Sequence, residues 1–325
     1  MVATTPPDIL KFLAARADEG IECTLVTLVS VIGGSSRAVG AQMAVAADGR
    51  RIGSFSGGCV EDAVASEAID ALGDGWGHLV RYGVGSPYID IRLPCGGGID
   101  LLFTPRPDPA AIRGVLELLD ARRPAALRIE CDKVTLADMV EEAPWDGLAL
   151  THTYQPPLQI HAFGQGEDLT AFAGLANAFG TSVHALSPEA ATCALLEAEG
   201  IKVTRLHTRS ALPLAEVDPW SAIVFLFHGR DWEEDLLPQT LAFPAFYHGA
   251  IGSRRTHAAR LEALRAAGVP EDRIATLRGH IGLIPATRDP ATLALSVLGE
   301  IVAEYNALAR WTYWTGTPLV TEAAQ

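Results

Sequence analysis

The spacing of hydrophobic residues differs between the two halves of the chain. From about residue 156 onward, short apolar runs alternate with segments whose apolar residues recur every three or four positions. These patterns predict strands at 158–163, 182–186, 201–206 and 221–227, and helices at 169–179, 188–199, 254–268 and 291–308. Such alternation indicates βαβ units, so we expect an α/β fold with a doubly wound parallel sheet.

Three of these helices have a capping residue at the expected start. Ser187, Ser253 and Asp289 stand directly before the predicted segments, and proline follows the first and the last. Serine and aspartate accept a hydrogen bond from an unpaired N–H of the first turn, and proline suits the first helical position. We therefore expect all three to be N-caps.

The first half has shorter and less regular segments. The pattern predicts helices at 9–17 and 60–72, strands at 21–32, 79–82 and 99–103, and a hairpin of 42–47 and 52–55. Residues 110–150 show one helix, 112–119, and weaker strand patterns. With prolines as boundaries, the expected parts are an N-terminal α/β domain at 1–107, a connector or domain edge at 108–155, a Rossmann-like domain at 156–310 and a tail at 311–325.

Composition narrows the classes of protein. The chain has 325 residues, 49% of them hydrophobic, and a net charge of -14, which fits a folded protein that repels nucleic acid and anionic lipid. No apolar run is long enough to span a membrane, and we expect no secretory signal at the N-terminus. Five cysteines are ordinary usage for a reducing compartment. The expected location is therefore the cytoplasm.

A glycine turn follows the first strand of the second half. Gly164 and Gly166 stand where a dinucleotide-binding turn brings a backbone close to pyrophosphate. Leu169 replaces the third glycine of that pattern, and the acidic Glu167 and Asp168 would repel a phosphate. A dinucleotide-binding pattern expects an acid after the second strand, where it would hold a ribose. Only Ser187 and Glu189 stand near that position. The turn thus favours a Rossmann-like fold more than it favours a bound nucleotide.

Two other segments of the second half carry candidate chemistry. His228 follows the most apolar strand, at the sheet edge where ligands bind in open α/β folds. Arg254 and Arg255 would lie in the first turn of a helix, where cations oppose the helix dipole. A ligand anion or a neighbouring carboxylate such as Asp231 or Asp235 would offset their charge.

Glycine loops of the first half contain two cysteines and an arginine. Cys59 lies in the segment 56–61 and Cys95 in the segment 93–98. A thiol near a helix N-terminus has a lowered pKa and could ligate a soft metal, carry sulfur or form a reversible disulfide; the alternative is a small buried residue in a tight turn. Arg37, in a Gly/Ser loop, suits a phosphate or carboxylate, although it could be a plain surface charge. The other three cysteines are expected in the core.

Several stretches together resemble the xanthine dehydrogenase accessory family of the XdhC/CoxI type. They read GGSSRAVGAQM and SFSGGCVEDAV within 26–64, LPCGGGIDLLF at 93–103, AFYHGAIGSRRTHAARLEAL at 245–264, and the segment up to residue 305. The resemblance covers nearly the whole chain in the family's order. It implies a non-catalytic maturation factor that binds molybdenum cofactor, supports its sulfuration and delivers it to a molybdenum hydroxylase of the xanthine or carbon monoxide dehydrogenase type.

The same resemblance implies where the cofactor binds. Molybdopterin carries a phosphate and a soft dithiolene metal centre, with Cys59 and Cys95 as implied metal contacts. The implied cofactor-binding residues are Arg37, Gly57, Gly58, Cys59, Glu61, Cys95, Gly164, Gly166, His228, Gly249, Ser253, Arg254 and Arg255. An apo-hydroxylase is the implied partner, whereas a cysteine desulfurase and a homodimer stay open.

Two other functions compete with this interpretation. The first is an NAD(P)-dependent oxidoreductase that uses the Rossmann-like half. The second is a docking protein whose cysteines are inert.

Overall fold

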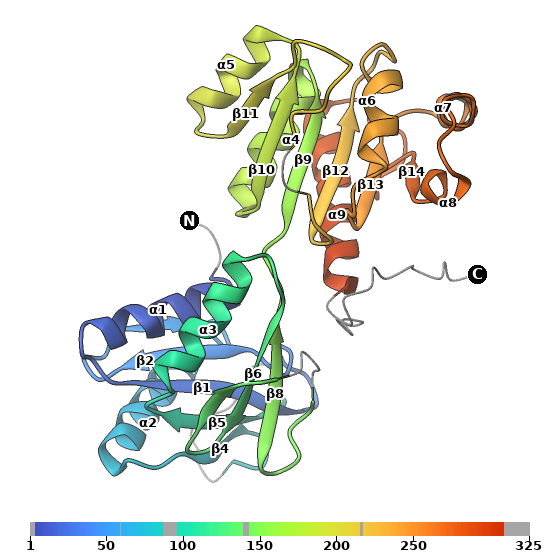
Figure 1. Ribbon diagram of the computed structural model, residues 1–325. Helices are drawn as coiled ribbons and strands as arrows, with labels where there is room; N and C mark the ends of the chain where they lie inside the picture. Colours follow the sequence, from blue (N-terminus) through green and yellow to red (C-terminus); the bar gives the residue numbers. More distant parts are fainter. Residues whose placement is uncertain (1–3, 59, 87–95, 139–142, 215–216, 309–325) are drawn as a thin grey trace. The chain divides into compact units, whose positions relative to one another are not determined.

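The computed structural model describes residues 4–58, 60–86, 96–138, 143–214 and 217–308 (Figure 1). Cys59 and Cys95 lie outside the described residues. The chain forms two compact units, one of residues 4–156 and one that begins at Pro157. Residues 108–155 therefore belong to the first unit.

A five-stranded antiparallel sheet is the centre of the first unit. Its strand order is β3-β2-β1-β5-β4. The strands are β1 (Cys23–Ile32), β2 (Gln42–Ala46), β3 (Arg51–Gly53), β4 (His78–Gly83) and β5 (Gly98–Pro105). β2 and β3 form the predicted hairpin, which turns at Asp48-Gly49.

Both faces of this sheet are covered, as the side chains of β1 that point to either face show by being buried. Val26 and Leu28 pack in the core formed with α2 (Glu61–Asp74). Leu25 and Val29 pack in a second core with α1 (Pro6–Asp18), α3 (Pro109–Asp120) and the three-stranded sheet β7-β6-β8. That small sheet is built from the weak strand patterns of 110–150, as β6 (Ala125–Glu130), β7 (Val134–Leu136) and β8 (Ala149–Tyr154).

The second unit contains the predicted parallel sheet. Its six strands run in the order β11-β10-β9-β12-β13-β14, and all five neighbouring pairs are parallel (Figure 1). They are β9 (Gln159–Gly164), β10 (Ser182–Ser187), β11 (Lys202–Arg205), β12 (Ser221–Leu226), β13 (Tyr247–Ala250) and β14 (Leu277–Gly279). β10 and β11 follow on one side of β9, and β12, β13 and β14 follow on its other side. The topological switch point therefore lies between β9 and β12.

Helices cover both faces of the parallel sheet. The core on one face includes side chains of α4 (Gly166–Phe179) and α9 (Pro290–Leu308), which pack against each other. The core on the other face includes α6 (Glu233–Thr240), α7 (Arg254–Ala266) and α8 (Glu271–Ile274). Within the described residues, α9 alone has the length and apolar composition of a membrane-spanning helix. Its buried side chains belong to the core of this unit.

Two of the three predicted caps are confirmed. The Ser253 hydroxyl accepts from the N–H of Thr256 at 3.1 Å, and Oδ1 of Asp289 accepts from the N–H of Thr292 at 2.8 Å. The prediction for Ser187 is wrong. Ser187 pairs with β11 as the last residue of β10, and α5 (Ala190–Ala198) begins after Glu189.

Candidate functional site

The glycine-rich loops of the first unit lie at one end of the antiparallel sheet. The end of β1 is paired with the start of β5, because Ile32 lies opposite Gly98, and Gly83 at the end of β4 lies opposite the same glycine. At β2 and β3, Met43 lies opposite Gly53. The loops that follow β1, β3 and β4 therefore leave the sheet at the same end.

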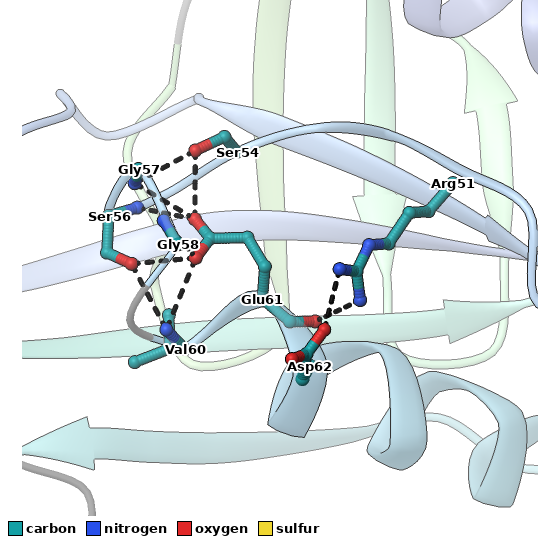
Figure 2. A network of polar contacts seen from close by, with 8 residues as sticks. All are labelled: Arg51, Ser54, Ser56, Gly57, Gly58, Val60, Glu61 and Asp62. Carbon is teal, nitrogen blue, oxygen red and sulfur yellow. Dashed lines mark hydrogen bonds and ion pairs between the residues drawn. The ribbon is translucent and has the colours of Figure 1, made fainter.

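Glu61 organises the loop between β3 and α2 (Figure 2). It is the first residue of α2, and its carboxylate turns back onto the preceding loop. It accepts hydrogen bonds of 2.7 to 3.2 Å from the N–H groups of Phe55, Ser56, Gly57, Gly58 and Val60. The hydroxyls of Ser54 and Ser56 add two more, each of 2.8 Å. Both carboxylate oxygens are thus taken up by the protein's own loop.

The surroundings of Glu61 keep it ionised. Burial raises the pKa of the carboxyl, but hydrogen bonds from the N–H of Ser56 and the hydroxyls of Ser54 and Ser56 outweigh burial and hold the pKa well below its ordinary value of 4.5. Gly57 and Gly58 have φ of 77° and 126°, a region that favours glycine. The two glycines therefore let the loop turn its N–H groups toward one carboxylate.

Arg37 lies over this loop. Its Nε donates to the carbonyl oxygen of Ser54 at 3.2 Å, and its Nη1 donates to that of Ser36 at 3.2 Å. The Ser36 hydroxyl donates to the carbonyl oxygen of Phe55 at 2.7 Å, which joins the loop after β1 to the loop after β3. Arg37 is exposed, and no carboxylate in the described part of the chain forms an ion pair with it.

The glycine segment before β5 adjoins the loop after β1. A side chain at Gly97 would come within 2.1 Å of the carbonyl oxygen of Gly34 and 2.7 Å of that of Ile32, so only glycine fits. Three exposed apolar side chains belong to the same end of the sheet, with exposed fractions of 40 to 55%: Ile32, Val39 and Val84. A cationic group and apolar side chains thus lie at the same end of the sheet as Gly58 and Gly96, the described neighbours of Cys59 and Cys95 in the sequence.

The other three cysteines differ in burial. Cys23 and Cys193 are buried, as the sequence indicates, and Cys131 is half-buried. Burial raises the pKa of all three thiols, to about 11 for Cys23. They are poor nucleophiles and metal ligands at neutral pH.

In the second unit, the switch point brings the predicted turn and His228 together. Gly164 ends β9, Gly166 begins α4, and His228 follows β12. The imidazole is mostly exposed, and its Nε2 lies 2.8 Å from Oδ2 of the buried Asp168. The contact is an ion pair when the imidazole is protonated.

Gly249 and the two arginines are placed differently. Gly249 lies inside β13, where a side chain would come within 2.5 Å of the Tyr247 ring, so its position has a packing reason. Arg254 and Arg255 are exposed in the first turn of α7. Among the described residues no carboxylate forms an ion pair with either, and Asp235 lies 4.0 Å from another arginine.

The fold and these loops define a class: a two-unit α/β protein with a loop-lined antiparallel sheet and a Rossmann-like second unit. The model of the XdhC and CoxI family matches residues 16–83, and that of the XdhC Rossmann domain matches residues 160–301. The molybdenum cofactor insertion chaperone PaoD of Escherichia coli is 35% identical over 91% of this chain and 87% of its own. The chain therefore belongs to the XdhC and CoxI family.

Two further similarities agree with this assignment. A Bacillus subtilis protein described as a probable xanthine dehydrogenase subunit is 47% identical over 62 residues, which are 19% of this chain and 18% of that one. A crystal structure described as a xanthine dehydrogenase from Bacillus halodurans has a TM-score of 0.72 and 19% identity, and covers 92% of this chain and 96% of that one. At that identity the structural similarity concerns the fold alone.

Proposed function

We propose that this chain binds molybdenum cofactor, supports its sulfuration and helps to insert it into a molybdenum hydroxylase, as a cytoplasmic factor without turnover of its own. Membership of the XdhC and CoxI family and the likeness to a cofactor insertion chaperone support this role. The structural support comes from the loop-lined end of the antiparallel sheet.

The observation that carries the proposal is the exposed guanidinium of Arg37. It is held over the loop 54–60 by two carbonyl oxygens and has no carboxylate partner in the described residues. The N–H groups of Gly34, Ser35 and Ser36 also find no protein acceptor in that part of the chain. Arginine and free N–H groups suit a phosphate, which molybdopterin carries. Arg37 is therefore the proposed phosphate ligand.

The thiols of Cys59 and Cys95 are proposed to contact molybdenum or its sulfur, or to form a redox pair. In the sequence they adjoin Gly58 and Gly96, and these two glycines belong to loops at this end of the sheet. Glu61 is proposed to act on the cofactor through the loop before α2, because its oxygens are already bonded to that loop. The exposed Ile32, Val39 and Val84 are proposed to meet the acceptor enzyme.

The remaining proposed cofactor contacts lie in the second unit. The positive charge of Arg254 and Arg255 has no carboxylate partner among the described residues, which suits an anionic ligand. Ser253 caps the same helix. Gly57 and Gly58 of the first unit, with Gly164, Gly166, His228 and Gly249, complete the set that family resemblance implies. The N–H of Gly166 is not proposed as a donor to the cofactor, because Glu189 and Thr192 accept from it.

The test is anaerobic purification from cells that make molybdenum cofactor, followed by metal analysis and fluorescence of the oxidised pterin. We expect molybdenum and pterin in near-equal amounts. In Arg37→Ala both should fall about tenfold or more, since a charge-assisted hydrogen bond contributes about 1.5–3 kcal/mol. Arg113→Ala is the matched control, because Arg113 is a surface arginine paired with Asp18 at 2.6 Å.

Cys59→Ser and Cys95→Ser test the thiols in the same assay. Unchanged cofactor in both would remove the thiols from the site, and unchanged cofactor in Arg37→Ala would remove the phosphate ligand. A wild-type protein with neither metal nor pterin but with a bound nucleotide would replace this proposal by the oxidoreductase.

A further inference from the structure

The switch point of the parallel sheet has a defined place for a dinucleotide. In a sheet with this strand order, pyrophosphate lies at the N-terminus of the helix after the first strand, which here is α4. An acid after the second strand, here β10, holds the ribose. Both positions belong to the second unit, whereas the proposed phosphate ligand Arg37 belongs to the first.

Glu189 joins the two positions. It follows β10 and precedes α5, yet its side chain reaches the start of α4. The N–H of Gly166 donates to Oε2 of Glu189 at 3.1 Å and to the hydroxyl oxygen of Thr192 at 2.9 Å. The Thr192 hydroxyl, which is buried, donates in turn to Oε2 of Glu189. A carboxylate of the chain itself thus occupies a donor that a phosphate would use.

Other residues of this turn oppose a phosphate as well. Glu167 and Asp168 lie in the first turn of α4, so three carboxylates belong to the same short region. The Nε2 of the nearby His228 lies 2.8 Å from Oδ2 of Asp168. Leu169, in place of a third glycine, is fully buried, and its Cβ would lie 3.3 Å from a Cβ placed on Gly164.

We infer that Glu189 is a built-in occupant of the phosphate position and that it excludes dinucleotides from the Rossmann-like unit. A pyrophosphate can reach the N–H of Gly166 only after the Glu189 carboxylate has left it. Because that carboxylate is negative, it also repels the incoming phosphate. Glu189 stands where an acid holds the ribose in a dinucleotide-binding protein, and here it is hydrogen-bonded to the protein's own Gly166.

The experiment measures binding of ADP-ribose, which contains the pyrophosphate and both riboses of a dinucleotide. Isothermal calorimetry and melting temperature are recorded for the full chain, for Glu189→Ala and for Glu197→Ala. Glu197 is an exposed residue of α5, the helix that begins after Glu189, and its replacement gives the same change of charge. Melting of each variant without ligand shows that it is folded, and inorganic pyrophosphate is tested in parallel.

We expect no binding by the wild-type chain or by Glu197→Ala at 1 mM ADP-ribose, and an affinity at least tenfold higher in Glu189→Ala. Binding of ADP-ribose by the wild-type chain would overturn the inference. A folded Glu189→Ala variant that gains no affinity would also overturn it, because something other than Glu189 would then close the position. Neither result bears on cofactor retention by the first unit, which is measured separately with Arg37→Ala.

Discussion

The replacement Glu61→Ala tests the loop at the end of the antiparallel sheet most directly. It removes the carboxylate that accepts five N–H and two hydroxyl hydrogen bonds. Gly57 and Gly58 are exposed, so water can replace their bonds. Phe55 and Val60 are 1% exposed, but the N–H of Val60 also donates to the hydroxyl oxygen of Ser56 at 3.1 Å. The N–H of Phe55 therefore loses an acceptor that water replaces poorly.

The size of the effect follows from this one buried donor. A buried donor left without a partner costs about 1–3 kcal/mol, and a charged acceptor lies toward the upper end of that range. The free energy of unfolding of the first unit should therefore fall by about 2–3 kcal/mol. Asp62→Ala is the matched control, because Asp62 is the next residue, is 91% exposed and forms only a surface ion pair with Arg51. It should change stability far less.

Urea unfolding is monitored by hydrogen-exchange mass spectrometry, which distinguishes the stability of the first unit from that of the second. Peptides that span residues 54–72 report on the loop and α2, and peptides from the parallel sheet serve as an internal reference. Glu61→Ala should increase exchange in the former and leave the latter unchanged. An effect of Glu61→Ala no larger than that of Asp62→Ala would refute the reasoning.

Acidity gives a second check on Glu61. Because its folded pKa is lower than the ordinary 4.5, the ionised carboxylate stabilises the fold fully at pH values above about 4.5. This contribution is lost as the pH falls toward the lower folded pKa. The difference in stability between wild type and Glu61→Ala should therefore be constant from pH 7 to about 5.5 and shrink below 4.5. A constant difference down to pH 3 would contradict the assignment.

Two further predictions concern the second unit. Gly249→Ala should destabilise it by about 1–3 kcal/mol in urea unfolding, because the new methyl group would overlap the Tyr247 ring, whereas Gly229→Ala meets open space and should be near neutral; equal effects would contradict this packing role. Burial lowers the pKa of His248 to about 4 from 6.5, so the unfolded chain binds a proton there first and stability should fall as the pH drops from 6.5 toward 4. His248→Gln should reduce that slope by up to about 1.4 kcal/mol per pH unit, with the exposed His207→Gln as the control for the replacement itself. An unchanged slope in His248→Gln would show that folding does not lower the pKa of this imidazole.

The parallel sheet was predictable because its signals are local. Runs such as 222–227 are apolar throughout, and Ser253 and Asp289 bond to N–H groups only three residues away. The helix α6 escaped prediction, since it has three acids in its first turn and contains Pro238, which hide its periodicity. The edge strand β14 has only three residues, too few to show a pattern. Ser187 looked like a cap because a capping residue and the last residue of a strand can have the same local sequence.

The sequence by itself indicated which loops are candidates for binding, because glycine, serine, cysteine and arginine stand close together there. Only the tertiary structure decided which loops meet. The antiparallel register places the last residues of β1, β3 and β4, which are Ile32, Gly53 and Gly83, at the same end of the sheet. No local pattern encodes that register. It also decided that the Glu61 carboxylate turns onto its own loop and that Glu189 reaches across 23 residues to Gly166. Both contacts depend on where a folded backbone directs its N–H groups, which neighbouring residues in one sequence do not reveal.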